Sequence, residues 1–167
     1  MKKVSSSNPS WRFRKKKPKQ INLVKAGWLL KTKYTPVNKL IKKLDVIFST
    51  YKRLSALSPQ GYIRCFTCGA FLTFRMADCG HYIGRENMST RFEEKNTECQ
   101  CHSCNRYAEG KKDIFAINLQ KKYGAGILEW LNQKKGEIKQ FTASELEDLI
   151  SKYKKLLTEL KKGQIDG

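Results

Sequence analysis

Two pairs of cysteines carry the clearest chemical signal in this sequence. Both pairs have the spacing Cys-x-x-Cys, and they are Cys65 with Cys68 and Cys101 with Cys104. Two such pairs can present four thiolates as a tetrahedron, which suits a structural Zn²⁺ ion. A disulfide pair, a redox motif and an iron ion in the same cage are the alternatives. We predict structural zinc, with Cys79 and Cys99 outside the cage as free thiols and Cys99 as the one substitute ligand.

Zinc does not explain the polar residues that lie between the two pairs and directly after the second. Among them, Asn96 lies five residues before Cys101 and nine before Asn105, and His81 precedes all three. This register resembles the His-Asn-His nucleases. In that group the first histidine lies on a β-hairpin, the asparagine in the following loop, and the last ligand directly after the second cysteine pair. The resemblance implies a ββα-metal fold, a hairpin and helix around a catalytic metal ion.

A narrower family has a similar set of motifs. Several short segments resemble the NinG (Rap) recombination proteins of lambdoid phages over roughly 40–160: Cys65-Phe66-Thr67-Cys68-Gly69, Asp78-Cys79-Gly80-His81-Tyr82, Arg91-Phe92, Asn96, Gln100-Cys101, Cys104-Asn105 and Gly110. The resemblance implies a divalent-metal-dependent DNA endonuclease that cuts branched recombination intermediates such as D-loops and Holliday junctions. The chain departs from the family at its N-terminus, because no cysteine precedes Cys65.

The resemblance also implies catalytic roles. His81 would be the general base that takes a proton from the water attacking the phosphodiester. Asp78 and Asn105 would bind catalytic Mg²⁺ or Mn²⁺, which stabilises charge on the departing 3′ oxygen. Asn96 would hold the loop and orient His81 through hydrogen bonds.

Two positions depart from the pattern of many His-Asn-His nucleases. Gly80 stands where those enzymes carry a metal-binding aspartate, so Asp78 must reach the ion from three residues before His81. Asn105 stands where they carry a final histidine. The alternative for His81 is a structural histidine beside the core or the zinc. His102 is expected to be an exposed side chain or a spare zinc donor.

Positive charge is concentrated in the first third of the chain. The net charge is +19, and residues 1–60 hold 16 Lys and Arg with a single acid, a net charge of +15. Such a segment favours a polyanionic partner, here DNA. In residues 1–20, read as a disordered arm, aromatic and basic residues alternate, as in surfaces that stack on bases and contact phosphates; a solvated tail is the alternative. The predicted DNA contacts are Arg85 and Arg91 as phosphate clamps, with Arg12, Arg14, Lys15, Lys16 and Lys17 in the arm.

The elements that must position these residues follow from the spacing of apolar side chains. Apolar residues at three- and four-residue steps predict helices over 37–57, 113–122 and 127–134. Thr142 and Glu145 form a capping box, which predicts the start of a last helix. The region from 62 to 110 is rich in Gly and Cys and reads as hairpins followed by a helix, whereas residues 21–36 are ambiguous.

We therefore predict an α+β chain, a small zinc-stabilised ββα-metal module flanked by helices. Its parts are a disordered basic arm (1–20), a basic segment with an amphipathic helix (21–60), the nuclease core (61–112) and a helical scaffold (113–167). No apolar run approaches the roughly 20 residues that span a bilayer. The basic start lacks the features of a signal peptide, so we do not expect secretion. The family resemblance implies the cytoplasm of a bacterial host.

Two rival functions remain open from the sequence. One is a non-catalytic zinc module that binds and organises branched or single-stranded DNA in recombination. The other is a sequence-specific or defence nuclease, although no recognition helix is evident. A homodimer would suit paired nicks across a junction, and recombination proteins are the other partners that the resemblance implies.

Overall fold

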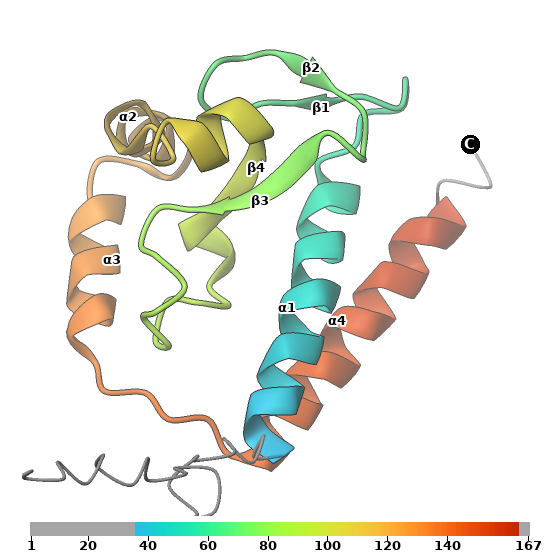
Figure 1. The fold of residues 1–167 in the computed structure, drawn as a ribbon, viewed down its shortest axis with the longest axis vertical. Coiled ribbons are helices and arrows are strands. Elements are labelled where there is room, and N and C mark those ends of the chain that lie inside the picture. Colours follow the sequence, from blue (N-terminus) through green and yellow to red (C-terminus); the bar gives the residue numbers. More distant parts are fainter. Residues whose placement is uncertain (1–35, 164–167) are drawn as a thin grey trace, which may run out of the picture. The chain divides into compact units, whose positions relative to one another are not determined.

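Helices frame two small antiparallel sheets in the computed structural model, which describes residues 36–163 (Figure 1). This arrangement confirms the predicted α+β class. Of the ambiguous segment 21–36, all but Pro36 lies outside the described residues. So do the predicted DNA contacts of the arm, Arg12, Arg14, Lys15, Lys16 and Lys17.

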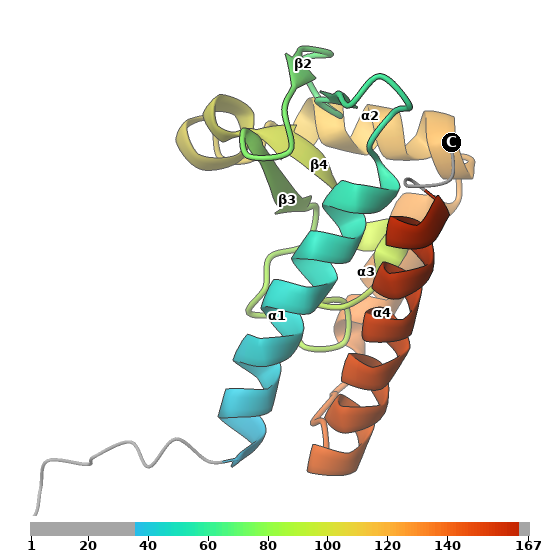
Figure 2. The ribbon, with the colours of Figure 1, turned by 90° about the vertical axis from the view of Figure 1, so that its right-hand side faces the viewer.

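The first and last helices pack against each other. Helix α1 (Pro36–Ser55) and helix α4 (Ala143–Gly163) lie side by side in both views (Figures 1 and 2). Phe48 of α1 makes edge-on contacts with Tyr153 of α4 and Phe92, at ring separations of 5.0 and 5.8 Å. Leu44 and Leu146 fill the same core and are fully buried. The apolar stripe predicted for the first helix is therefore a packing surface.

Helix α4 begins at the predicted capping box. The backbone N–H of Thr142 donates to Glu145 Oε2 at 2.7 Å, and the backbone N–H of Glu145 donates to Thr142 Oγ1 at 3.2 Å. These reciprocal bonds satisfy donors that the first helical turn leaves without partners. The prediction from the Thr–x–x–Glu spacing is confirmed.

Two hairpins form the β-structure. Strands β1 (Ile63–Arg64) and β2 (Phe71–Leu72) make a short hairpin around the first cysteine pair. Strand β3 (Ala77–His81) pairs antiparallel with β4 (Thr97–Cys101), and Cys79 lies opposite Cys99. Among the described strands β3 pairs only with β4, so its other edge is open.

Helices follow directly after β4. A π-helical turn (Ser103–Tyr107) leads to α2 (Lys112–Tyr123) and then α3 (Ile127–Gly136). Phe115, Leu119 and Leu131 of these two helices form a buried cluster with Ile83. They therefore hold the start of the connection between β3 and β4. None of the described helices combines the length and the apolar character needed to cross a membrane.

Candidate functional site

The structure brings the four predicted zinc ligands together. The Sγ atoms of Cys65, Cys68, Cys101 and Cys104 all lie within 4.8 Å of one another. The Cys68 and Cys101 sulfurs are 3.9 Å apart, and a tetrahedral Zn²⁺ with bonds of about 2.3 Å would separate its sulfurs by about 3.8 Å. The donor set and its spacing therefore fit a structural zinc ion.

Backbone N–H groups point at the sulfurs of this cage. The N–H of Cys101 donates to Cys65 Sγ at 3.3 Å, and the N–H of Cys104 donates to Cys101 Sγ at 3.4 Å. Burial acts to raise the pKa of Cys65, but hydrogen bonds from the backbone and from Thr67 outweigh it and lower that pKa to about 6. A thiolate is the form that binds metal, so this environment prepares Cys65 as a ligand.

The other two cysteines are buried thiols outside the cage. Cys79 and Cys99 are each 3% exposed, and neither is disulfide-bonded. Burial raises the pKa of Cys79 to about 11 and that of Cys99 to about 12, so both are protonated at neutral pH. They are free thiols, as the cysteine spacing predicted, and they serve as small apolar groups in the packing of the hairpin.

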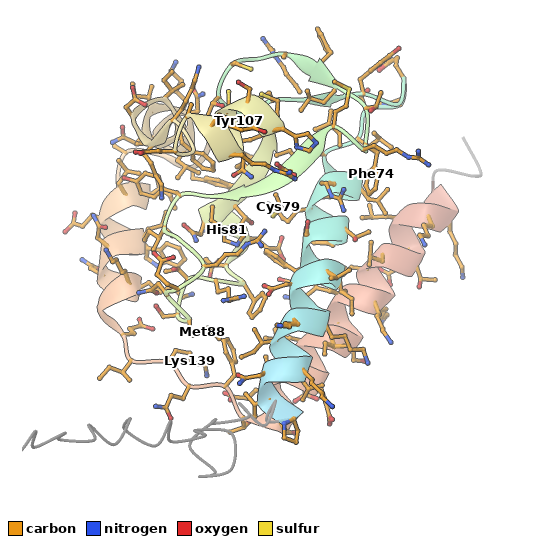
Figure 3. The ribbon with its side chains drawn as sticks, in the orientation of Figure 1. Phe74, Cys79, His81, Met88, Tyr107 and Lys139 are labelled. Carbon is orange, nitrogen blue, oxygen red and sulfur yellow. The ribbon has the colours of Figure 1, made fainter. Side chains whose placement is uncertain are left out.

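A cleft of about 450 Å³ runs along the open edge of β3. It brings together four of the predicted site residues, Asp78, His81, Arg85 and Asn105. Figure 3 shows His81 and Cys79 along β3 and Tyr107 on the π-helical turn that follows β4. The cleft is also lined by three cations that we did not predict as site residues from the sequence, Arg53, Arg106 and Lys112. Glu109 also lines the cleft, so its four cations outnumber two acids, Asp78 and Glu109, and the excess of positive charge suits an anion such as a phosphodiester.

Asp78 is the centre of a hydrogen-bond cluster in this cleft. Its carboxylate accepts hydrogen bonds from His102 Nδ1 at 2.8 Å and Asn105 Nδ2 at 3.2 Å. Arg106 donates to both carboxylate oxygens, at 2.8 and 2.9 Å. Burial acts to raise the pKa of Asp78, but the bonds from Arg106, His102 and Asn105 prevail and lower it to about 2. Asp78 is therefore ionised at any pH at which the protein would work.

His102 belongs to this cluster rather than to the zinc cage. Its side chain is 42% exposed, which agrees with the prediction of an exposed residue. The four-cysteine cluster does not include it, so the alternative of a spare zinc donor is not supported. Positions 102, 105 and 106 lie one helical turn apart, so their side chains emerge on one side. This spacing could have indicated from the sequence that His102 and Arg106 lie on the same side as Asn105.

His81 is held in one orientation by the loop that follows it. Its Nε2 lies 3.0 Å from the carbonyl oxygen of Arg91. A carbonyl only accepts, so Nε2 carries the proton in the neutral ring and Nδ1 is left with a lone pair. Burial and the charge of Arg85 lower the pKa of His81 to about 4, against the opposing effect of backbone hydrogen bonds with Arg91 and Cys79. At neutral pH the ring is therefore an uncharged base.

Asn96 fastens the loop that supplies this carbonyl. It is fully buried, its Oδ1 accepts from the N–H of Ile83 at 2.8 Å, and its Nδ2 donates to the carbonyls of Ile83 and Thr90 at 2.9 and 3.0 Å. These bonds join the two halves of the connection 82–96, next to Arg91. The hydrogen bonds of the Asn96 side chain go to Ile83 and Thr90 rather than to His81, so it acts on that ring through the loop backbone.

The two predicted phosphate clamps have different surroundings. Arg85 lines the cleft. Arg91 does not, because its guanidinium pairs with both carboxylate oxygens of Asp45 on α1, at 3.0 and 2.6 Å, and donates to the carbonyl of Arg85 at 2.7 Å. Arg91 therefore ties the loop to α1, and Arg85 is the one of the pair positioned to meet a ligand in the cleft.

Comparison with known proteins gives one match. A family model described as the bacteriophage lambda NinG protein matches residues 1–164. No curated protein and no solved structure matches the chain. The family implicates the chain in phage recombination. Because the match covers almost the whole sequence, the resemblance seen in the cysteine, histidine and asparagine motifs is confirmed, and the chain belongs to the bacteriophage lambda NinG family.

Proposed function

We propose that the chain is a divalent-metal-dependent DNA endonuclease of the ββα-metal, His-Asn-His-like class, which cuts branched recombination intermediates. One observation carries the proposal: a single basic cleft holds Asp78, His81, Arg85 and Asn105. Residues that the family resemblance assigns to one reaction are thus within one ligand-sized space. The order of hairpin, loop and helix around that space supports the same class.

The side chains in the cleft fit a hard divalent cation. Asp78 Oδ2 and the amide nitrogen of Asn105 are 3.2 Å apart. Adjacent ligands of one Mg²⁺, with bonds of about 2.1 Å, are separated by about 3 Å. Rotation of the Asn105 amide by half a turn would present its oxygen instead of its nitrogen. Asp78 and Asn105 would hold the cation, which when bound would stabilise negative charge on the leaving 3′ oxygen.

His81 would supply the base. Its Nδ1 would take a proton from a water molecule, the water oxygen would attack phosphorus, and the bond from phosphorus to the 3′ oxygen would break. The neutral ring is available at pH 7 because its pKa is about 4. A bound phosphodiester places negative charge beside the ring, which stabilises the imidazolium and brings the pKa closer to neutrality.

Cations of the cleft would hold the scissile phosphate. Arg53 lies on α1, Lys112 on α2 and Arg85 in the connection after β3, and all three line the cleft. Guanidinium groups form paired, charge-assisted hydrogen bonds with phosphate oxygens. In this arrangement the substrate backbone lies between α1 and the π-helical turn, with His81 beside it.

The second candidate is a zinc-stabilised module that binds DNA without cutting it. The bidentate contact of Arg106 with Asp78 favours this candidate, because it fills the carboxylate that a catalytic cation would need. The basic cleft and the cysteine cage suit both functions. The two functions differ in what they require of His81.

The test compares wild type with His81→Ala on an end-labelled four-way junction, a D-loop and a linear duplex, with Mg²⁺ or with chelator. Wild type should cut the branched substrates only with Mg²⁺. His81→Ala should bind the junction with unchanged affinity and cut at least a hundredfold more slowly, as loss of a general base implies. Binding without cutting under Mg²⁺ and Mn²⁺ would support the second candidate. Equal cutting of linear duplex would remove the selectivity for branches.

A further inference from the structure

The hairpin of β1 and β2 has one buried and one exposed face. Ile63 and Leu72 are opposite each other and buried, at 0% and 3% exposure. Arg64 and Phe71 are opposite each other on the outer face, where Phe71 is 74% exposed. Tyr62 precedes Arg64 by two residues, so it is expected on that same face; it is 51% exposed. A cation and two aromatic rings therefore share one outward surface.

Two grooves meet at this surface. One, of about 590 Å³, is lined by Ala56, Ser58, Gln60, Tyr62, Arg64 and Phe71. The other, also about 590 Å³, passes beside the first cysteine pair and is lined by Arg64, Lys121 and Lys122 among others. Among residues 36–163, none that lines either groove is acidic. Arg64 lines both grooves.

The two grooves offer different chemistry on the two sides of Arg64. The first presents the rings of Tyr62 and Phe71, and the second presents the amino group of Lys121. Lys122 already pairs with Glu98 at 2.6 Å. A nucleotide is complementary to this arrangement, because it has a flat base for the aromatic side and a charged phosphate for the cationic side. Aromatic side chains stack on every base with little regard to sequence, provided that the base is unpaired.

We infer that this hairpin surface, defined by Tyr62, Arg64, Phe71 and Lys121, binds an unpaired nucleotide of branched DNA. The base stacks on Phe71 and Tyr62, and its phosphate contacts Arg64 and Lys121. This inference rests on the proposed function, because it names an unpaired base as the feature by which the protein would recognise a branched substrate. A duplex lacks that feature, since its bases are already stacked on one another. The absence of acidic residues from both grooves favours a polyanion over a basic or mixed protein surface.

The end of α1 connects this surface to the cleft. Arg53 lines the cleft, while its guanidinium lies 4.3 Å from the centre of the Phe74 ring and donates to the Phe74 carbonyl at 3.4 Å. Ala56, three residues later, lines the aromatic groove. Figure 3 shows Phe74 beside this end of α1. The cleft and the aromatic groove therefore flank the same end of α1.

The experiment measures binding in chelator, so that it does not depend on cutting. Fluorescence anisotropy of the full chain is recorded with a labelled 12-nucleotide single strand, a fork with two single-stranded arms, and a blunt duplex. Phe71→Ala should weaken binding of the single strand and the fork about five- to a hundredfold, the range for loss of one stacked base, with little change for the duplex. Arg64→Gln should weaken the same probes and reduce their salt dependence.

Three controls define the role of the ring. Phe71→Trp keeps an aromatic face and should bind as wild type does. Phe71→Leu keeps apolar bulk without that face and should resemble Phe71→Ala. Ile138→Ala removes a 96% exposed apolar side chain elsewhere and should have no effect.

Several outcomes would overturn the inference. Unchanged single-strand affinity in both Phe71→Ala and Arg64→Gln would do so, as would equal weakening for duplex and single strand. If sedimentation showed that Phe71→Ala dissociates a dimer without changing DNA affinity, the groove would be an interface between copies. Failure of the endonuclease proposal looks different: the wild type would never cut, while the effect of Phe71→Ala on fork binding would persist.

Discussion

The side chain of Gln100 occupies the space that a β-carbon on Gly80 would need. A β-carbon built there lies 2.0 Å from Gln100 Oε1 and 2.8 Å from Gln100 Cδ. Gln100 is fully buried, and its Nε2 donates to the carbonyl of Gly110 at 2.8 Å and to Thr67 Oγ1 at 3.3 Å. A side chain at the position before His81 would therefore have to displace Gln100, and the carboxylate that β3 brings to the cleft is that of Asp78.

Gly80→Ala should lower the free energy of unfolding by about 1–3 kcal/mol, the usual cost of an overpacked core, because Gln100 must leave its partners to make room. Urea unfolding measures this. Gly136→Ala is the matched control and should cause no loss, because no atom of the described residues outside its own helix lies within 4 Å of the added carbon. Combining Gly80→Ala with Gln100→Ala should cost less than the sum of the two single changes. Additive costs would show that the two residues do not compete for space.

Asn96→Ala should destabilise the protein by about 2 kcal/mol or more. The change leaves the N–H and carbonyl of Ile83 buried without the bonds that Asn96 supplies, while the carbonyl of Thr90 loses one of its two donors and keeps the N–H of Glu93 at 3.1 Å. Thermal unfolding gives the loss. Asn118→Ala removes a single hydrogen bond, to the carbonyl of Phe66, and should cost less. If cutting is observed, Asn96→Ala should also slow it at temperatures where the protein stays folded, since the carbonyl that holds His81 would move.

Stability should fall as the pH is lowered from about 6.5 towards 4. The pKa of His81 is lowered from 6.5 to about 4 in the folded protein, mainly by burial, so between these values the unfolded chain binds the extra proton. His81→Gln should flatten this part of the curve of unfolding free energy against pH. The contribution of Asp78 is separate, because its pKa of about 2 lies below the ordinary 3.8 and its stabilisation is lost only as the pH falls below about 4. An identical slope in wild type and His81→Gln between pH 6 and 5 would contradict the assignment.

Removal of zinc should unfold the region around both hairpins. We expect about one equivalent of zinc per chain after gel filtration and none in Cys104→Ser, because a structural site needs all four ligands. Circular dichroism before and after chelation reports the loss of structure. Cys79→Ala is the control: its sulfur lies outside the cage, so the metal content should stay at one equivalent. A full equivalent in Cys104→Ser would place the metal elsewhere.

Local features of the chain could be predicted because they depend on neighbouring residues. Helices α1 to α4 follow from apolar spacing, and the start of α4 from Thr142 and Glu145, which bond across one turn. The ligand set of the cage follows from two Cys-x-x-Cys pairs, since each pair needs only a tight turn to align its thiols. The positions of His81, Asn96 and Asn105 could be assigned through the family resemblance.

Other relationships required the tertiary structure, because they join residues far apart in the chain. Arg91 meets Asp45 across 46 positions, and this pairing, rather than residue type, decides that Arg91 braces a loop while Arg85 faces the cleft. His102 and Arg106 reach Asp78 only because β3 and β4 pair in one register and the π-helical turn folds back over them.

The sequence by itself determined which chemical groups this protein has and which of them are neighbours in the chain: four thiolates for a zinc ion, a histidine, two asparagines and an excess of cations. Only the tertiary structure decided which groups face one another. Spacing in the chain sets the geometry of one turn or one hairpin. Packing between distant segments decides the ion pairs, the pKa values of buried groups and the lack of space for a side chain at Gly80.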